Sequence, residues 1–227
     1  MNKLWKVFYV RVVLALSMAM NLDSRVNAQA VNHQNQNIKG SVKSQSIGGK
    51  MPILINSSTK KAEKNYWATT PECFADAQAL YGRKFKIDVA ATQLTKKCSV
   101  FFSEHENALI TPWLDDWWCN PPFDSKLAFL TWAYVQKSFF KTSGMMLIPF
   151  EPCTGWWEQY VEGKASVVYE PDGRYPFLES DGKTKKSGVN FASCFVLFTP
   201  TYTNETLRVR FKRGIRSTNS INIGVAA

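Results

Sequence analysis

Large apolar side chains are unevenly distributed along the 227 residues of this chain. Residues 31–64 are rich in Asn, Gln, Ser, Gly and Lys and contain few large apolar residues, which is the composition of a linker or a disordered tail. From residue 65 onward, apolar positions recur with the spacing of helices or strands. The pattern therefore predicts two parts, a basic polar extension over residues 1–64 and a folded domain over residues 65–227.

Three segments have the apolar spacing of α-helices. Residues 70–72, Thr-Pro-Glu, provide a capping residue, a proline suited to the first turn and an early acidic residue, and Gly82 provides an end signal. Residues 125–141 repeat apolar side chains at intervals of three and four, and Gly144 marks their end. A shorter helix is predicted over residues 156–161.

Seven further segments have strand patterns, and several of them lie between the predicted helices. They cover residues 85–90, 99–102, 117–119, 145–150, 166–169, 191–198 and 207–211. A polar, glycine-containing loop is predicted over residues 172–188. The run over residues 145–150 is entirely apolar, which is typical of a strand that is buried on both faces. Strands that alternate with helices favour an α/β fold with a mainly parallel sheet flanked by helices.

The first thirty residues have the features of a secretory signal. Lys3, Lys6 and Arg11 precede a short apolar stretch, and residues 28–30, Ala-Gln-Ala, match a cleavage site. The apolar stretch is too short to cross a bilayer as a helix. An extension from an upstream start codon, with Met51 as an internal start, explains the same segment.

The net charge of +10 is concentrated at the N-terminus. Residues 1–64 contain ten Lys and Arg residues against two acidic ones, so the predicted domain has only a small basic excess. Whole-chain charge is therefore not evidence of DNA binding. The two histidines are far apart, no C-x-x-C pair exists, and the cysteines are odd in number, so neither a metal site nor a disulfide framework is predicted. Buried free thiols in a reducing compartment fit the five cysteines, Cys73, Cys98, Cys119, Cys153 and Cys194.

Residues 120–123, Asn-Pro-Pro-Phe, follow a predicted strand and precede a predicted helix. Proline has no backbone N–H, so this turn offers the Asn120 side-chain oxygen and the carbonyl of Asn120 or Pro121 as acceptors, with few competing donors. Two acceptors beside the ring of Phe123 suit a planar group that carries an exocyclic NH2. A Pro-Pro pair can also simply end a strand, but a strand, a tight loop and a helix form the arrangement in which α/β proteins place ligands.

Further motifs surround this turn in a fixed order. They are Trp67-x-x-Thr70-Pro71, Ile87-Asp88-Val89-Ala90-Ala91, Trp113, Trp118-Cys119-Asn120-Pro121-Pro122-Phe123, Gly173-Arg174-Tyr175-Pro176-Phe177, Gly188-Val189-Asn190 and Val196-Leu197-Phe198-Thr199-Pro200. With this set the chain resembles the phage-encoded DNA adenine-N6 methyltransferases, the Dam-like family, over about residues 65–200. The resemblance implies a Rossmann-like methyltransferase fold that uses S-adenosylmethionine.

The resemblance also implies roles for particular residues. The catalytic turn would be Asn120, Pro121, Pro122 and Phe123, and the cofactor would be bound by Trp67, Thr70, Pro71, Asp88, Ala90, Ala91 and Glu104. Small residues at the loop after the strand allow close approach of the backbone, and an acidic residue past the next strand suits the ribose hydroxyls. A capping role for Asp88 and a solvated role for Glu104, with Glu106 close by, are the structural alternatives.

Two features depart from the usual methyltransferase pattern. The glycine-rich loop is replaced by residues 88–92, Asp-Val-Ala-Ala-Thr, and Phe123 stands where tyrosine is more usual. Stacking on a base survives the second change, whereas a hydroxyl contact does not.

The implied activity is transfer of a methyl group from S-adenosylmethionine to N6 of an adenine that flips out of double-stranded DNA. Arg208, Arg210 and Lys212 alternate with apolar residues, so they are expected to bind phosphates, although a solvated sheet face gives the same pattern. Methylation of another planar amine or amide, such as an RNA base or a protein glutamine, and a non-catalytic nucleic-acid-binding role on a decayed methyltransferase fold are the alternatives. A phage enzyme of this kind would act in the cytoplasm of a bacterial host without stable membrane association, and secretion is the alternative.

Overall fold

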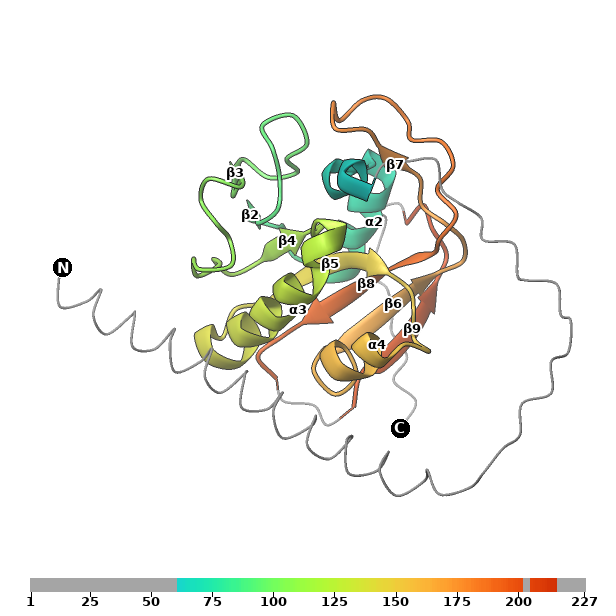
Figure 1. The fold of residues 1–227 in the computed structure, drawn as a ribbon. Helices are drawn as coiled ribbons and strands as arrows, with labels where there is room; N and C mark the ends of the chain where they lie inside the picture. Colours follow the sequence, from blue (N-terminus) through green and yellow to red (C-terminus); the bar gives the residue numbers. More distant parts are fainter. Residues whose placement is uncertain (1–60, 202–204, 216–227) are drawn as a thin grey trace, which may run out of the picture. The chain divides into compact units, whose positions relative to one another are not determined.

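The computed structural model describes residues 61–201 and 205–215, all within the compact unit Thr59–Ala227 (Figure 1). The predicted signal-like segment over residues 1–30 and most of the predicted extension over residues 1–64 lie outside the described residues. The boundary between residues 64 and 65 therefore stays a prediction. No helix among the described residues has the length and apolar character that spanning a membrane would require.

Seven strands form the main sheet in the spatial order β3-β2-β4-β5-β8-β6-β9 (Figure 1). Their bounds are β2 Ile87–Asp88, β3 Val100–Phe101, β4 Trp117–Cys119, β5 Gly144–Pro149, β6 Val167–Pro171, β8 Ser193–Phe198 and β9 Leu207–Phe211. Neighbouring strands are parallel except at β8, which runs antiparallel to both β5 and β6. The predicted α/β class with a mainly parallel sheet is confirmed.

Each strand of the main sheet overlaps a predicted one, but β5 begins one residue earlier and β6 ends two residues later than predicted, and the strands nearest the N-terminus are shorter. The segment over residues 85–90 contributes only β2, because the chain turns directly after it. The carboxylate of Asp88 accepts hydrogen bonds from Ala90 N at 3.3 Å and Lys97 N at 3.0 Å, and these bonds hold the loop that follows the strand.

Helix α2 (Pro71–Tyr81) has the ends that the sequence predicts. Thr70 Oγ1 accepts a hydrogen bond from Cys73 N at 3.3 Å, and Gly82 adopts a left-handed conformation with φ 73° while its N–H donates to the Gln78 carbonyl. Glycine suits this position because it has no Cβ to oppose a positive φ. The predicted helix is confirmed at both ends.

The prediction of one continuous helix over residues 125–141 is wrong. The segment consists of the 3₁₀ turn η2 (Phe123–Ser125), α3 (Lys126–Val135) and the π-helical turn η3 (Gln136–Phe140). The π turn begins at Gln136, whose buried carboxamide accepts a hydrogen bond from Trp113 N at 3.0 Å. The turn ends at Lys141, which has φ 59°.

The helices cover the two faces of the sheet, α2 on one face and α3 with α4 (Gly155–Tyr160) on the other (Figure 1). Successive residues of a strand point to opposite faces, so the neighbours Trp117 and Trp118 enter different layers. Trp118 packs edge-on against Phe74 of α2 at 5.3 Å, whereas Trp117 packs against Trp113 at 4.8 Å. Both tryptophans are fully buried.

Gly144 does not end a helix, as its sequence position suggests, but begins β5 opposite Trp117. A Cβ at this position would collide with the indole ring and carbonyl oxygen of Trp117. The glycine is therefore required by the packing of β4 against β5.

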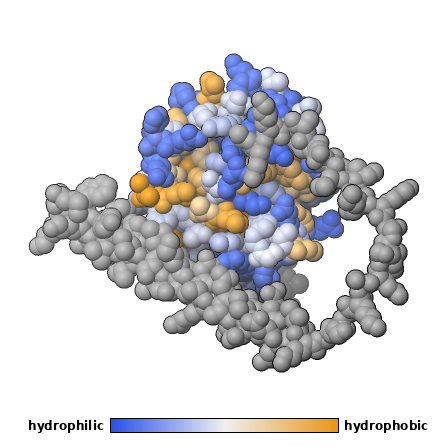
Figure 2. Space-filling model, viewed as in Figure 1, coloured by the Kyte–Doolittle hydropathy of each residue, from blue (hydrophilic) through white to orange (hydrophobic). Residues whose placement is uncertain are grey.

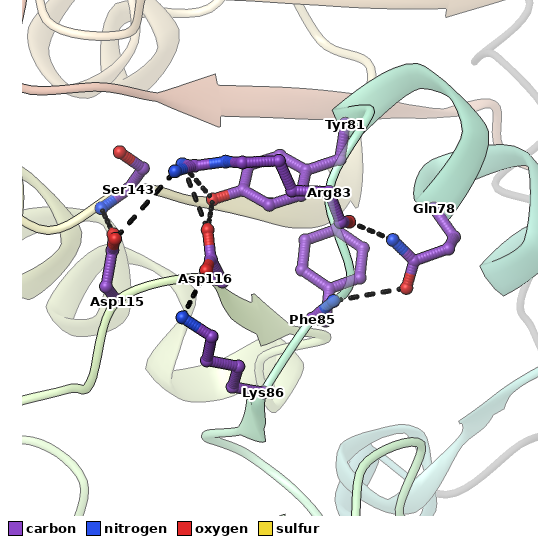
Figure 3. A network of polar contacts seen from close by, with 8 residues as sticks. All are labelled: Gln78, Tyr81, Arg83, Phe85, Lys86, Asp115, Asp116 and Ser143. Atoms are coloured by element: carbon purple, nitrogen blue, oxygen red, sulfur yellow. Dashed lines mark hydrogen bonds and ion pairs between the residues drawn. The ribbon is translucent and has the colours of Figure 1, made fainter.

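A polar network ties together the segments that precede β2, β4 and β5 (Figure 3). Asp116, which is 4% exposed, accepts hydrogen bonds from the Tyr81 hydroxyl and the Lys86 ammonium, each at 2.8 Å, and forms an ion pair with Arg83 at 2.9 Å. Burial raises the pKa of Asp116, but the donors outweigh it and hold the pKa below its usual value. The neighbouring Asp115 accepts from Ser143 N at 2.8 Å, so this network secures the amino ends of the strands.

All five cysteines are free, as predicted, but the expectation that all are buried is wrong for Cys153, which is exposed. Burial raises the pKa of the Cys73, Cys119 and Cys194 thiols well above the usual value, so these thiols are unreactive.

Two short elements near the N-terminus of the described chain are absent from the sequence expectations. The 3₁₀ helix η1 (Lys61–Tyr66) precedes β1 (Ala68–Thr69). Strand β1 pairs antiparallel with β7 (Phe177–Leu178), which lies in the region expected to be a polar loop. Two-residue strands of this kind have too few positions to show a periodic pattern.

Candidate active site

The order of the strands reverses at β2, which lies between β3 and β4. These three strands are parallel, so the loops that follow them leave from the same edge of the sheet. Open α/β sheets bind ligands in the crevice at such a reversal. A cavity of about 420 Å³ lies here, lined by residues that follow β2, β3 and β4 together with residues 65–67 at the end of η1 and just after it.

Asn120 is the residue of the Asn-Pro-Pro-Phe turn with the most informative surroundings. It follows β4, is half-buried, and lines both the large cavity and a second one of only about 10 Å³. Its side-chain Nδ2 donates to the carbonyl oxygen of Trp67 at 2.9 Å. This bond orients the carboxamide, so that the side-chain oxygen Oδ1 is available as an acceptor beside the cavities.

The other residues of the turn are divided between the two cavities. Pro122 lines the large cavity, and its carbonyl is occupied because it accepts from Ser125 N at 3.1 Å. Pro121 and Phe123 line the small cavity instead. The turn therefore separates a spacious cavity from a nearly closed one.

The rings of Phe123, Phe177 and Phe191 line the small cavity. Together with Trp67, which lines the large cavity, they form an aromatic cluster. Phe123 meets Trp67 and Phe191 edge to face, with ring centroids 5.7 Å and 5.3 Å apart. Trp67 stacks parallel to Phe191 at 6.3 Å. Phe191 was not singled out from the sequence, because a lone phenylalanine before a strand has no distinguishing pattern.

The residues predicted to bind the cofactor are only partly brought together. Trp67, Ala90, Ala91 and Glu104 line the large cavity. Thr70 and Pro71 do not line it, since they form the first turn of α2, and Asp88 does not line it either. Asn65, Tyr66 and Asn107 also line the cavity, although the sequence did not single them out.

Asp88 is fully buried and reaches the cavity only through the loop that it holds. Burial raises the pKa of its carboxyl to about 6, although hydrogen bonds from the backbone N–H groups of Lys97 and Ala90 oppose this rise. Lys97 lies close by, and burial lowers the pKa of its ammonium group. The geometry gives Asp88 the task of positioning Ala90 and Ala91.

Glu104 and Glu106 differ clearly in their surroundings. Glu104 lines the cavity and accepts a hydrogen bond from the Tyr66 hydroxyl at 3.2 Å. Glu106 turns back to its own loop, where it accepts from Ser103 N at 2.8 Å and Ser103 Oγ at 2.5 Å. Only Glu104 is therefore placed to meet a ligand in the cavity.

The predicted basic face on β9 is only partly realised. Arg208 already pairs with Glu162 at 2.5 Å and with Glu170 at 3.8 Å. Arg210 and Lys212 are exposed, whereas Leu207, expected on the apolar face, is 60% exposed. Strand β9 forms one edge of the sheet and is separated from β4 by β5, β8 and β6.

Comparisons with known proteins identify the family of this chain. The chain matches the family described as DNA N-6-adenine-methyltransferase (Dam) over residues 56–220. A DNA N-6-adenine-methyltransferase of Haemophilus phage HP1 (strain HP1c1) is 28% identical over 149 residues, which cover 65% of this chain and 86% of the relative. A DNA N-6-adenine-methyltransferase of Escherichia phage T1 is 28% identical over 114 residues, which cover 49% of this chain and 47% of the relative.

No solved structure matches the chain. The family match begins inside the predicted extension and continues past the last motif that carries the resemblance, so it covers most of the chain. The chain belongs to the DNA N-6-adenine-methyltransferase (Dam) family, as the sequence motifs predict.

Proposed function

We propose that this adenine-specific DNA methyltransferase binds S-adenosylmethionine in the large cavity and methylates N6 of an adenine that flips out of double-stranded DNA. The position of Asn120 carries the proposal. Its anchored carboxamide lies between a cavity large enough for the methyl donor and an aromatic cluster suited to a base.

The residues of the large cavity fit S-adenosylmethionine in size and chemistry. A volume of about 420 Å³ is within the usual range of small-molecule sites, which is roughly 300–1,000 Å³. Glu104, in the loop that follows β3, suits the ribose hydroxyls, and the small Ala90 and Ala91 allow close approach to the backbone.

The position of the cavity also supports a Rossmann-like arrangement of the fold. Ligands of doubly wound α/β proteins bind at the carboxyl ends of strands where the strand order reverses, and β2 and β4 flank such a point here. The loop after β2 has no glycine-rich sequence, so Asp88 supplies by hydrogen bonds the loop shape that glycines usually supply.

The chemical task of the turn is to make the adenine amine nucleophilic. The lone pair of the amine nitrogen is delocalised into the adenine ring. Hydrogen bonds from the two amine N–H groups to Asn120 Oδ1 and the Pro121 carbonyl would localise the lone pair on nitrogen. These bonds strengthen as positive charge develops on nitrogen, so they stabilise the transition state more than the ground state. S-adenosylmethionine, when bound, supplies a methyl group on a positively charged sulfur. Because the acceptors act by position and charge, the reaction needs no strong base.

The aromatic cluster would receive the flipped base. The small cavity beside Phe123 is about 10 Å³, so a base can enter only if rings of the cluster move apart. Flipping costs a few kcal/mol, and stacking on an aromatic ring returns about 1–3 kcal/mol per base. We assign the two walls of the opened slot to Phe123 and Phe191.

Labelled S-adenosylmethionine and unmethylated duplex DNA test this proposal directly. Asn120→Ala should reduce the rate of methyl transfer by a factor of about 100 or more. Its affinity for S-adenosylmethionine, measured by calorimetry, should change little. Asn120→Asp keeps a side-chain oxygen that can accept a hydrogen bond from the adenine amine, but it loses the N–H group that donates to the Trp67 carbonyl, so it should keep part of the activity. An Asn120→Ala enzyme with normal methyl transfer would contradict the proposed mechanism.

A further inference from the structure

The segment Phe177–Lys186 forms a β-hairpin in the region that the sequence predicts as a polar loop. Its arms are joined by hydrogen bonds from Glu179 N to Thr184 O and from Lys186 N to Phe177 O, each at 2.8 Å. Asp181 closes the tip, because its carboxylate accepts from Lys183 N at 2.8 Å and Thr184 N at 2.9 Å. The hairpin is therefore a structured element with a defined tip.

The base of the hairpin is attached to the catalytic turn. Strand β7, its first arm, pairs with β1, which directly follows Trp67. The carbonyl of Trp67 receives the hydrogen bond from Asn120, and Phe177 packs against the Trp67 ring at 5.9 Å. Trp67 therefore contacts both this arm of the hairpin and Asn120, so a shift of the arm would be passed to Asn120 through Trp67.

The tip of the hairpin contacts the opposite wall of the large cavity. Gly182 has φ 69°, and a Cβ built on it would lie 2.5 Å from the carbonyl oxygen of Leu94. Leu94 belongs to the loop after β2, in which Thr92 and Thr95 line the cavity. Glycine is thus required twice at this position, by its backbone angle and by the close approach. The hairpin connects both sides of the active site.

The hairpin also carries cations without ion-pair partners. Lys183 and Lys185 are exposed, and neither forms an ion pair within residues 61–201 and 205–215. Lys186 is half-buried, pairs with Glu179 at 3.0 Å and lies over the Trp67 ring at 5.5 Å. On β9, Arg208 is neutralised by two glutamates, whereas the exposed Arg210 and the following Lys212 form no ion pair among the described residues, so the position of the hairpin beside the catalytic turn distinguishes the two surfaces.

We infer that the hairpin Phe177–Lys186 is the element that binds the DNA backbone, with Lys183 and Lys185 as its phosphate contacts. The inference rests on the proposed function and moves the main DNA contact from β9 to the hairpin. Phosphate contacts fix the position of a duplex without reading its sequence. A duplex held by an element that touches both cavity walls is held beside Asn120.

The salt dependence of DNA affinity tests the hairpin, with a mixed-sequence fluorescent duplex as the probe in anisotropy titrations. Each lost phosphate contact reduces the slope of log affinity against log salt by about 0.9, so Lys183→Gln/Lys185→Gln should reduce it by about 1.8. The matched control, Arg210→Gln/Lys212→Gln, removes the same charge from β9 and should change the slope by less than about half of that. Thermal unfolding followed by circular dichroism verifies that both variants are folded.

An unchanged slope in the hairpin variant, or a larger loss in the β9 variant, would overturn the inference. The result can be separated from a failure of the proposed function. If the natural enzyme neither binds S-adenosylmethionine in calorimetry nor transfers label, the proposed function fails, whereas the slope still decides whether the hairpin binds DNA. If it methylates DNA and the slopes do not differ, the hairpin inference alone fails.

Discussion

Two glutamates that are only two residues apart have different tasks at this site. Glu104 lines the large cavity, whereas Glu106 accepts hydrogen bonds from Ser103 and holds its own loop. We predict that Glu104→Gln weakens binding of S-adenosylmethionine about 10- to 100-fold, because a hydrogen bond to a charged group contributes roughly 1.5–3 kcal/mol. Glu106→Gln should have a clearly smaller effect in the same calorimetric titration. Equal losses in both variants would remove the assigned role of Glu104.

Asp88 should make the stability of the protein depend on pH. Burial raises the pKa of its carboxyl to about 6, above the value of about 4 in an unfolded chain. Between these values the folded protein holds a proton that the unfolded chain has lost, so the free energy of unfolding falls as pH rises from about 4 to about 6 and is then level. The difference is on the order of 3 kcal/mol.

Asp88→Asn removes this titration, so the fall in the free energy of unfolding over that pH window should become smaller. Urea unfolding at several pH values measures it. The variant loses one of two backbone hydrogen bonds, since an amide offers a single acceptor oxygen, but it also removes the buried charge that Asp88 carries at neutral pH, so the slope with pH and not the stability at one pH tests the titration. Two pH profiles with the same slope would show that Asp88 does not titrate in this window.

At the scale of elements, local sequence signals predict where a helix begins and ends, but they do not predict a break in a helix that coincides with a tertiary contact. Helix α2 begins and ends where Thr70 and Gly82 predict, because both ends are set by hydrogen bonds within a few residues. The segment over residues 125–141 was predicted as one helix because its apolar spacing is continuous. Its change to a π turn coincides with a contact to Trp113, which lies more than twenty residues away in sequence.

The hairpin Phe177–Lys186 shows the same limitation for strands. Its strand β7 has two residues, and its pairing partner β1 is more than one hundred residues distant. The polar sequence around Gly182 has the composition of a loop, and only the pairing of β7 with β1 shows that part of it is a strand. The hairpin is therefore visible only in the tertiary structure, although its turn residues follow ordinary rules.

At the scale of the whole molecule, the N-terminal limit of the active domain can be tested by truncation. Asn65 exchanges two hydrogen bonds with Asp124 in η2, at 3.0 Å and 3.1 Å, and Tyr66 reaches Glu104. We predict that a chain without residues 1–58 binds S-adenosylmethionine within about threefold of the full chain, whereas one without residues 1–66 binds at least about tenfold more weakly. Calorimetry on both proteins measures this. Equal affinity of the two shortened chains would exclude a role for η1.

The sequence by itself determined the fold class and the family, and it proposes the turn over residues 120–123 as the one that carries the chemistry. These depend on local patterns, because apolar periodicity sets helices and strands, and Asn120 with two prolines sets the acceptor geometry of a short loop. Trp67, Ala90, Ala91 and Glu104, which the sequence proposes as cofactor contacts, line one cavity, and their role in binding stays a prediction.

Only the tertiary structure decided which partners these groups have. It buried Asp88 in its own loop, kept Thr70 and Pro71 in the first turn of α2, and neutralised Arg208 with glutamates. It also brought Trp67, Phe177 and Phe191 together around Phe123. The pairing of Arg208 and the aromatic contacts join residues far apart in the chain, so their distances depend on how the sheet and its loops pack and not on any local spacing.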